Sequence, residues 1–327
     1  YKEVKKDKTI QLLFALSSVI IIALVALPSV VALKGGGAVP VEPVPFPVSV
    51  DPESKTILER PTAELPLTRS NTLVASALSG ADMALGAISK VVIDAPAYQL
   101  LASAMGPKAV VIYAGMRREQ VALEFGSVLG WTKAERDEFL NAATSTTPEG
   151  TLYPSTYVVP RDISPTDARL LIYERFNERI LSRYTAEVEA QVPLKDALII
   201  ASLIERETAD QEEMHIISGI LWNRLFQGMR LQVDATLQYV RGTSRNGWWP
   251  VVRPRDKFLK SPFNTYQSAG LPPAPIASPS VAAVVAALNP ARTQCMFYFH
   301  DRKGGFHCSK TYLEHVDLLK KAYGRGR

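Results

Sequence analysis

A long uncharged run near the start of the chain constrains its organisation more than any other feature. From Ile10 to Leu33 the sequence reads IQLLFALSSVIIIALVALPSVVAL, without a charged residue. An apolar run of this length can cross the hydrocarbon core of a bilayer as a helix. Residues 1–9 hold four lysines, whereas Lys34 alone follows closely. The positive-inside rule therefore places residues 1–9 in the cytoplasm and the rest of the chain outside.

A cleaved signal peptide is the alternative interpretation of this run, with VVA before Leu33 as the cleavage site. The apolar core of a signal peptide is usually shorter, and we favour an uncleaved anchor. Residues 1–9 are thus expected to be a cytoplasmic tail and residues 10–33 a single transmembrane helix. The folded part of the protein would then lie on the non-cytoplasmic side of the membrane.

The composition excludes several classes of protein. The chain has 327 residues, enough for about two domains, and a net charge of +5 from scattered Lys and Arg residues. Scattered cations argue against a nucleic-acid reader. The two cysteines, Cys295 and Cys308, and four histidines show no CxxC or HExxH spacing, so we expect no metal and no cofactor. Whether the two cysteines form a disulfide is left open.

Residues 34–64 are rich in Gly and Pro and are expected to be an extended spacer. Ordered structure is expected from residue 65. Residues 109–115 (AVVIYAG) read as a short strand, and two helical segments follow. Thr132 and Glu135 have capping-box spacing at the start of the second segment. Residues 65–148 thus suit helices followed by a small α+β module.

Residues 149–327 are expected to form a second, mixed helical and β domain. EGTLYPSTYVVP (149–160) reads as a loop leading into a strand. Ser164 begins a long helix, a second helix follows Pro193, and a third helix ends near Gly228. The segments QCMFYFH and FHCSKTYLEH around DRKGG indicate a hairpin. The expected fold class is α+β throughout.

Glu205 and Glu207 are the most unusual residues of the second domain, because they follow an apolar helical run in ASLIERETAD (201–210). At 100° per residue they point about 200° apart, so they cannot both face one substrate atom. One carboxyl could be active while the other bonds an arginine or caps a loop. Both could equally be solvated at the helix end, and periodicity does not choose between these interpretations.

Amide, carboxylate and aromatic side chains that suit a glycan groove follow within about sixty residues. Taken singly, each is as easily explained as a turn or core residue, and only the set is informative. The candidates are Asn223, Arg230, Gln232, Asp234, Asn264 and Tyr266.

Several ordered motifs resemble the YceG-like family of endolytic murein transglycosylases. They are ASLIERET, GILWNRLFQGMRLQVDATLQY, SPFNTYQSAGLPPAPIASPS, AALNPA, FYF and SKTYLEH, and with the segment from Glu149 they cover about residues 149–315. In that family a LysM-like module precedes the catalytic domain, and residues 107–145 occupy its place. The chain departs from the family at Val233, Ala235 and Cys308, which bears on substrate preference more than on the reaction.

The resemblance implies a membrane-anchored lyase of cell wall biogenesis in the cytoplasmic membrane of a bacterium, with its catalytic part periplasmic or extracellular. It would cleave the β-1,4 bond between N-acetylmuramic acid and N-acetylglucosamine within nascent peptidoglycan strands, leaving 1,6-anhydro ends and limiting strand length. Glu207 matches the catalytic glutamate, and Glu205, Asn223, Arg230, Gln232, Asp234, Asn264 and Tyr266 are supporting or substrate-binding candidates. The expected partners are glycan strands, the membrane through residues 10–33, and cell-wall synthases or divisome proteins. The alternatives are a non-catalytic peptidoglycan-binding scaffold and a true glycoside hydrolase.

Overall fold

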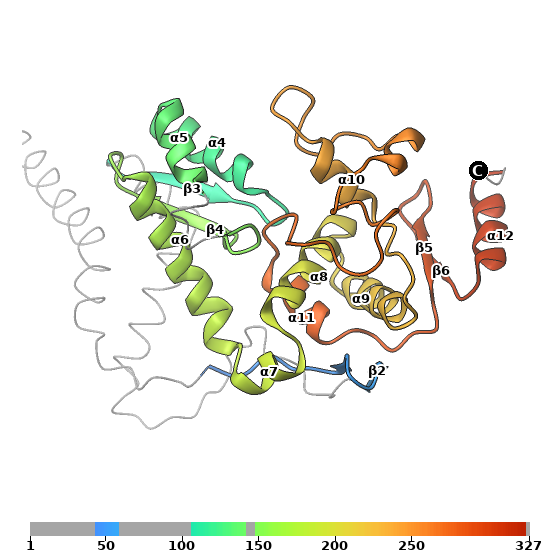
Figure 1. Cartoon of the computed structure of the whole chain (residues 1–327). Coiled ribbons are helices and arrows are strands. Elements are labelled where there is room, and N and C mark those ends of the chain that lie inside the picture. Colours follow the sequence, from blue (N-terminus) through green and yellow to red (C-terminus); the bar gives the residue numbers. More distant parts are fainter. Residues whose placement is uncertain (1–42, 59–105, 142–147, 325–327) are drawn as a thin grey trace, which may run out of the picture. The chain divides into compact units, whose positions relative to one another are not determined.

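The computed structural model describes residues 43–58, 106–141 and 148–324 (Figure 1). The chain divides into two compact units, one of which comprises Pro43–Ala63 and Val110–Arg327. Of the other unit, only residues 106–109 are described. The expected anchor at 10–33 and the helices expected between 65 and 105 lie outside the described residues. Within the described ranges, no helix is long and apolar enough to cross a membrane.

The described chain is mainly helical, with short strands near its start, around the first two helices and before the last helix. The strands form three two-stranded sheets, β1–β2, β3–β4 and β5–β6. The strands are β1 (Val50–Asp51), β2 (Thr56–Ile57), β3 (Lys108–Ile112), β4 (Ser155–Val159), β5 (Phe297–His300) and β6 (Phe306–Ser309). The helices are α4 (Arg118–Leu129), α5 (Lys133–Leu140), α6 (Pro165–Arg179), η1 (Leu181–Arg183), α7 (Ala186–Gln191), α8 (Leu194–Glu207), α9 (Gln211–Phe226), α10 (Asp234–Arg241), η2 (Pro254–Phe258), α11 (Val281–Leu288) and α12 (Tyr312–Tyr323).

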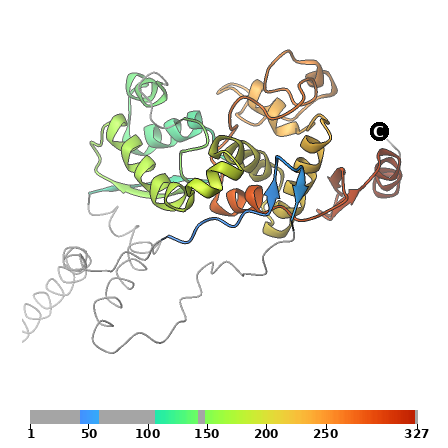
Figure 2. The same cartoon turned by 60° about the horizontal axis from the view of Figure 1, so that its bottom comes forward.

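Residues 43–58 are packed on the helices, although the sequence predicts an extended spacer over 34–64. Phe46 and Val50 are buried, and the backbone N–H of Ser49 donates to the Leu288 carbonyl at 3.0 Å, which places this segment beside α11 (Figure 2). The reason is an alternation of Pro with apolar residues. Extended proline-rich backbone can lie on a folded surface when the intervening side chains are apolar, whereas overall Gly and Pro content favoured a solvated spacer.

A strand–helix–helix–strand module is formed by β3, α4, α5 and β4, with β3 paired to β4. Its centre is aromatic: the ring centroid of Phe125 lies 5.3 Å from that of Trp131 and 5.8 Å from that of Phe139. The same hydrophobic cluster includes Ile172 of α6. Residues on both sides of the domain boundary expected after residue 148 thus share one core, and the boundary itself stays a prediction.

The helix starts in this part of the chain follow the predicted caps. Thr132 Oγ1 accepts a hydrogen bond from the backbone N–H of Glu135. The Glu135 carboxylate in turn accepts from the backbone N–H of Thr132 at 2.7 Å. Ser164 caps α6 with Pro165 in the first turn. These predictions are confirmed because a cap depends on residues only three positions apart.

Helix α8 is the buried centre of the helical region. Every residue from Ala197 to Ile204 is buried, and α9 and α11 pack against it. Gly219 of α9 allows a close approach of the chain that follows α11. A Cβ at Gly219 would lie 2.2 Å from the Ala291 carbonyl oxygen. This packing fixes where the last turn of α8, which carries Glu205 and Glu207, reaches the surface.

The hairpin predicted near the C-terminal end is confirmed, and it carries a disulfide. Strands β5 and β6 are antiparallel with Tyr298 opposite Cys308, and Cys295 precedes β5. The two cysteines are bonded to each other across 13 positions of sequence. The disulfide therefore closes the base of the hairpin and answers the question that spacing left open.

Removing this disulfide should loosen the hairpin. The double replacement Cys295→Ser with Cys308→Ser releases a loop whose closure contributes about 3 kcal/mol in the chain-entropy picture. We expect a lower melting temperature and faster proteolysis between residues 295 and 310. Thermal unfolding and limited proteolysis measure both effects, with wild type treated with reductant as the parallel sample. An unchanged cleavage rate in this segment would show that the hairpin is held by packing alone.

Glu149 is a buried carboxyl close to the first module. Its two oxygens accept from the Arg118 backbone N–H at 3.1 and 3.3 Å. Burial raises the pKa of Glu149 to about 8, and the nearby Glu119 carboxylate adds to the rise. The folded protein therefore holds a proton at Glu149 that an unfolded chain releases near pH 4.5.

This proton makes stability depend on pH. Because the folded-state pKa of Glu149 lies above the unfolded value, stability is greatest at low pH and falls as pH rises from about 4.5 to about 8, by up to about 5 kcal/mol. Glu149→Gln should abolish that part of the fall. Melting temperatures between pH 5 and 8.5 test this, with the exposed Glu174→Gln as control. Parallel pH profiles for wild type and Glu149→Gln would contradict it.

Candidate active site

The two glutamates at the end of α8 serve different neighbours, as their angular separation predicts. Glu205 Oε2 accepts from the backbone N–H of Ser280 at 2.9 Å and from its Oγ at 2.6 Å. Ser280 is the N-cap of α11, so a carboxylate there complements the positive end of that helix. Glu205 therefore stabilises the start of α11, whereas Glu207 faces a cavity.

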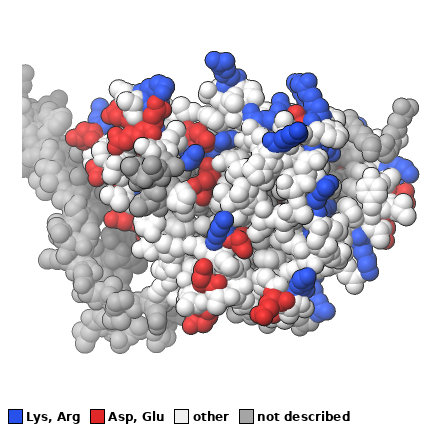
Figure 3. All heavy atoms as spheres, viewed as in Figure 1, with Lys and Arg blue, Asp and Glu red and all other residues white. Residues whose placement is uncertain are grey.

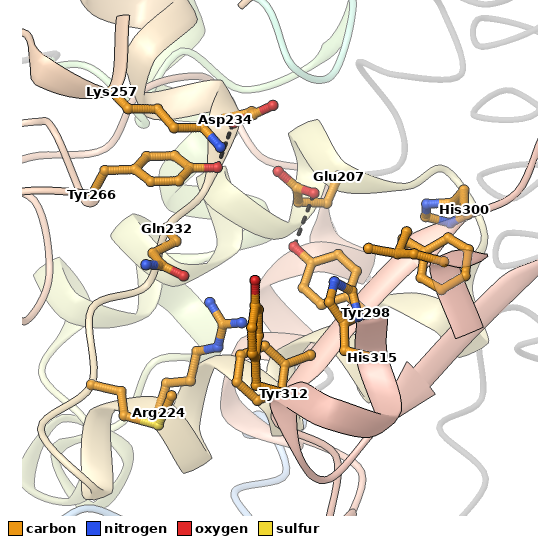
Figure 4. A pocket seen from close by; sticks show the side chains of 14 residues that line it. Glu207, Arg224, Gln232, Asp234, Lys257, Tyr266, Tyr298, His300, Tyr312 and His315 are labelled. Carbon is orange, nitrogen blue, oxygen red and sulfur yellow. Dashed lines mark hydrogen bonds between the residues drawn. The ribbon is translucent and has the colours of Figure 1, made fainter. Parts of the chain in front are cut away.

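The cavity beside Glu207 has a volume of about 840 Å³ (Figure 4). Its lining comes from α8, α9, the chain leading into α10, the loop that holds Tyr266, β5 and α12. Aromatic, basic and acidic side chains meet in it, which suits a polar ligand with apolar ring faces. The lining residues are Glu207, Arg224, Met229, Gln232, Asp234, Lys257, Tyr266, Phe297, Tyr298, Phe299, His300, Tyr312, His315 and Leu319.

Tyr298 is the direct partner of Glu207. Its hydroxyl donates to Glu207 Oε2 at 2.9 Å. Burial raises the pKa of Glu207 above its usual value and Asp234 adds to this, while the Tyr298 hydrogen bond and the charges of His300 and Arg206 act in the opposite direction. The net rise keeps this carboxyl protonated to a higher pH than an exposed glutamate. Such a group can serve as a general acid.

Tyr298 is not among the site residues predicted from the sequence. The hairpin pattern places Tyr298 and His300 on one face of β5, because side chains alternate along a strand. It does not say what that face meets. The contact with Glu207 joins residues 91 positions apart, and nothing in either local pattern indicates it.

A second hydrogen bond defines another side of the cavity. Asp234, at the first turn of α10, accepts from the Tyr266 hydroxyl at 2.6 Å. The Lys257 ammonium lies 4.7 Å from the centre of the Tyr266 ring. Burial and the Asp234 carboxylate raise the pKa of Tyr266, so its hydroxyl stays a donor. The structure thus brings Asp234 and Tyr266, both predicted site residues, into one unit.

The backbone around Gln232 is held in an unusual conformation. Gln232 has a φ of 53°, in the left-handed region that residues other than glycine seldom adopt. Its N–H donates to the Thr265 carbonyl at 3.1 Å, and the Val233 N–H donates to Thr265 Oγ1 at 3.0 Å. The loop of Tyr266 therefore imposes this turn, which presents the exposed Gln232 side chain to the cavity.

Besides Glu205, three of the predicted site residues lie outside the cavity lining. Asn264 is fully buried and donates to the carbonyls of Lys257 and Leu259, so it shapes the loop before Tyr266. Asn223 donates to the Thr293 carbonyl at 2.9 Å and steadies the chain that leads into β5. Arg230 is exposed and does not line the cavity.

Arg224 and His300 also line the cavity. Arg224 is buried and donates to the carbonyls of Met296 (2.6 Å) and Leu231 (2.5 Å), and Figure 4 shows its guanidinium pointing into the cavity. His300 Nε2 lies 3.0 Å from Glu213 Oε2. The same oxygen accepts a hydrogen bond from the Thr208 hydroxyl at the end of α8. Both side chains therefore link the chain around β5 to α9, and Glu213 of α9 in turn contacts Thr208 at the end of α8, next to Glu207.

The described residues contain no group of three or more His, Cys, Asp or Glu side chains that could hold a metal ion. The fold is that of an α+β protein. Its cavity contains one desolvated carboxyl, that of Glu207, and tyrosine, amide and basic side chains surround it. The sequence model of the YceG-like family matches residues 88–321. Since this is most of the chain, the protein belongs to the YceG-like family.

Similar proteins agree with this assignment. The chain is 32% identical over 174 residues to the endolytic murein transglycosylase of Bacillus subtilis (strain 168), covering 53% of this chain and 47% of that protein. It is 31% identical over 157 residues to the protein of the same name from Streptococcus pneumoniae (strain D39), covering 47% and 28%. The chain thus spans less than half the length of these relatives.

A crystal structure of a YceG-like protein from Listeria monocytogenes superposes with a TM-score of 0.57 at 26% sequence identity. The superposition covers 72% of this chain and 81% of that one. The mixed α+β architecture is therefore shared with a solved member of the family.

Proposed function

We propose that this protein is a peptidoglycan lytic transglycosylase in which Glu207 acts as both acid and base. The observation that carries the proposal is the Glu207 carboxyl, which lies half-buried at the cavity wall with its pKa raised and one oxygen held by Tyr298. The names of the relatives in Bacillus and Streptococcus support the reaction class. The substrate would be the bond between N-acetylmuramic acid and N-acetylglucosamine within a glycan strand.

The chemistry needs only one carboxyl group. Protonated Glu207 first gives its proton to the glycosidic oxygen as the bond to C1 breaks. The resulting carboxylate then takes the proton from the C6 hydroxyl of the muramyl residue, whose oxygen attacks C1 and closes a 1,6-anhydro ring. No water is consumed. Tyr298 holds Oε2 in place, which leaves Oε1 to carry the proton.

The other predicted residues divide into two groups in this proposal. Gln232, Asp234 and Tyr266 line the cavity and would contact the sugars. Glu205, Asn223 and Asn264 would act through the segments that they hold. Arg230 is exposed outside the lining, so we assign it no contact with the reacting sugars.

A glycoside hydrolase is the second candidate, and one observation favours testing it. Hydrolysis of the common kind uses two carboxylates around the bond, and Asp234 shares the cavity with Glu207. The Tyr266 hydrogen bond occupies Asp234 Oδ1, which argues for a binding role. The third candidate, a non-catalytic scaffold, would bind strands without cutting them.

One product assay distinguishes the three functions. Purified glycan strands are incubated with the protein, and the products are analysed by mass spectrometry. Anhydro-muramyl ends formed inside strands support the proposal. Reducing ends with one added water would show a hydrolase instead, and intact strands that remain bound would show a scaffold.

We further propose a location and domain order for this activity. The uncharged run at 10–33 would anchor the chain in the cytoplasmic membrane, with residues 1–9 in the cytoplasm and a catalytic part, residues 149–327, on the outside. The strand–helix–helix–strand order of β3, α4, α5 and β4 supports a LysM-like module within residues 65–148 and the strand that follows. Peptidoglycan strands would be the main partner, and cell-wall synthases or divisome proteins would be further ones.

A further inference from the structure

Residues 241–260, which link α10 to the loop of Tyr266, form a strongly basic segment that we name the basic rim. It contains four Arg, two Lys and one acid, Asp256. Asp256 is buried and paired with Arg241 at 2.5 Å, so the single carboxylate of the rim is neutralised internally. Five exposed cations remain: Arg245, Arg253, Arg255, Lys257 and Lys260.

Two large apolar side chains stand among these cations. Val251 is 82% exposed and Phe258 is 77% exposed, values that most apolar side chains in the fold avoid. Figure 3 shows Lys and Arg side chains prevailing over this part of the surface, whereas Asp and Glu gather over α4 and α5. The surface therefore combines positive charge with projecting apolar groups.

The rim is held in this exposed arrangement by contacts at its base. Trp249 Nε1 donates to Gln120 Oε1 of α4 at 2.9 Å, and the Arg206 guanidinium lies 4.0 Å from the Trp249 ring centre. Gly242 lets the backbone of Trp248 approach, since a Cβ there would lie 2.0 Å from the Trp248 carbonyl oxygen. Trp248 and Trp249 therefore contact the rest of the fold, whereas the side chains of Val251 and Phe258 point outward into solvent.

We propose that the basic rim docks on the surface of an anionic lipid bilayer. Cations attract the negative surface, and isolated apolar side chains insert at the boundary between headgroups and acyl chains. A soluble anionic polymer would account for the cations but not for Val251 and Phe258. Lys257 belongs both to the rim and to the cavity lining, so docking sets the cavity mouth at the edge of the lipid surface. The proposal does not rest on the proposed reaction.

The test places a fluorescent label at Val251 in the full chain. Both native cysteines are in the disulfide, so Val251→Cys supplies a single free thiol for an environment-sensitive dye. The protein is reconstituted in vesicles of phosphatidylcholine, with or without phosphatidylglycerol and with a quencher on the acyl chains. We expect quenching only with phosphatidylglycerol. Raising salt from about 0.1 M to about 1 M shortens the Debye length from about 10 Å to about 3 Å and should reverse it.

Matched variants separate docking from simple proximity to the membrane. Leu313→Cys on α12 places the dye at a side chain that is also 77% exposed, away from the rim, and should not be quenched. Arg253→Gln with Arg255→Gln should abolish quenching at position 251, while Lys320→Gln with Lys321→Gln should leave it unchanged. Equal quenching at 251 and 313, or none at 251, would overturn the proposal. A response at 251 to soluble polyphosphate but not to vesicles would also overturn it, in favour of an anionic polymer.

Discussion

Replacing Glu207 with glutamine is expected to abolish formation of anhydro-muramyl ends while the protein stays folded. An amide of nearly the same shape can still accept the Tyr298 hydrogen bond, but it can neither give a proton to the glycosidic oxygen nor remove one from the C6 hydroxyl. Loss of both steps should lower turnover by roughly 10³-fold or more. Mass spectrometry of digested glycan strands measures the activity, and thermal unfolding shows that the fold is retained.

The matched control for this prediction is Glu212→Gln, an exposed glutamate in the first turn of α9 that should keep full activity. Glu205→Gln makes a second comparison, because that carboxylate supports Ser280 and not the cavity. Glu205→Gln should mainly lower the melting temperature, and turnover of the folded protein should change little. Full activity of Glu207→Gln would remove this residue from the mechanism, and an equal loss in Glu205→Gln at unchanged stability would reverse the division of roles.

Features that depend on neighbours in the sequence could be predicted without the structure. The caps at Thr132 and Ser164, the helix after Pro193 and the hairpin around DRKGG are each specified within a few residues. The angular argument for Glu205 and Glu207 belongs to the same class, since it uses only the helical repeat. The sequence alone therefore predicts that the two carboxyls point in different directions and have different partners.

Features that depend on distant segments could not be predicted in the same way. Glu207 meets Tyr298 across 91 positions, and Asp234 meets Tyr266 across 32. The packing of residues 43–58 was missed for the same reason, because their partners lie more than a hundred positions further along the chain. A pattern within one segment shows which side chains share a face and leaves open what that face contacts.

The resemblance to the family points to Glu207 as the proposed acid, and the geometry gives a physical reason for that choice. Glu207 lies where the buried helix α8 ends, so its carboxyl is desolvated by the fold and still borders the cavity. Glu205 is two residues earlier, and its carboxylate is stabilised by two hydrogen bonds from Ser280. Burial raises the pKa of Glu207, and a raised pKa is what the proton-donating step of the proposed reaction needs.

Tyr298→Phe tests whether the hydrogen bond to Glu207 tunes and orients the acid. The hydroxyl donates to one carboxyl oxygen and favours the charged form, so its removal should raise the pKa of Glu207 further. In the proposed reaction protonated Glu207 starts the cleavage, so activity should be lost as pH rises through that pKa. The alkaline limb of the pH profile should therefore move to higher pH.

Turnover of Tyr298→Phe at its own optimum should also fall, by about tenfold or more, because Oε1 is no longer held toward the bond that breaks. Tyr312→Phe is the matched control: it removes a hydroxyl from another tyrosine of the same cavity and should leave the pH profile in place. A packing defect alone would lower activity in Tyr298→Phe without moving the alkaline limb. The shift of that limb, measured as initial rates of anhydro-end formation between pH 4 and 9, thus separates a tyrosine that sets the state of the acid from one that only fills space beside it.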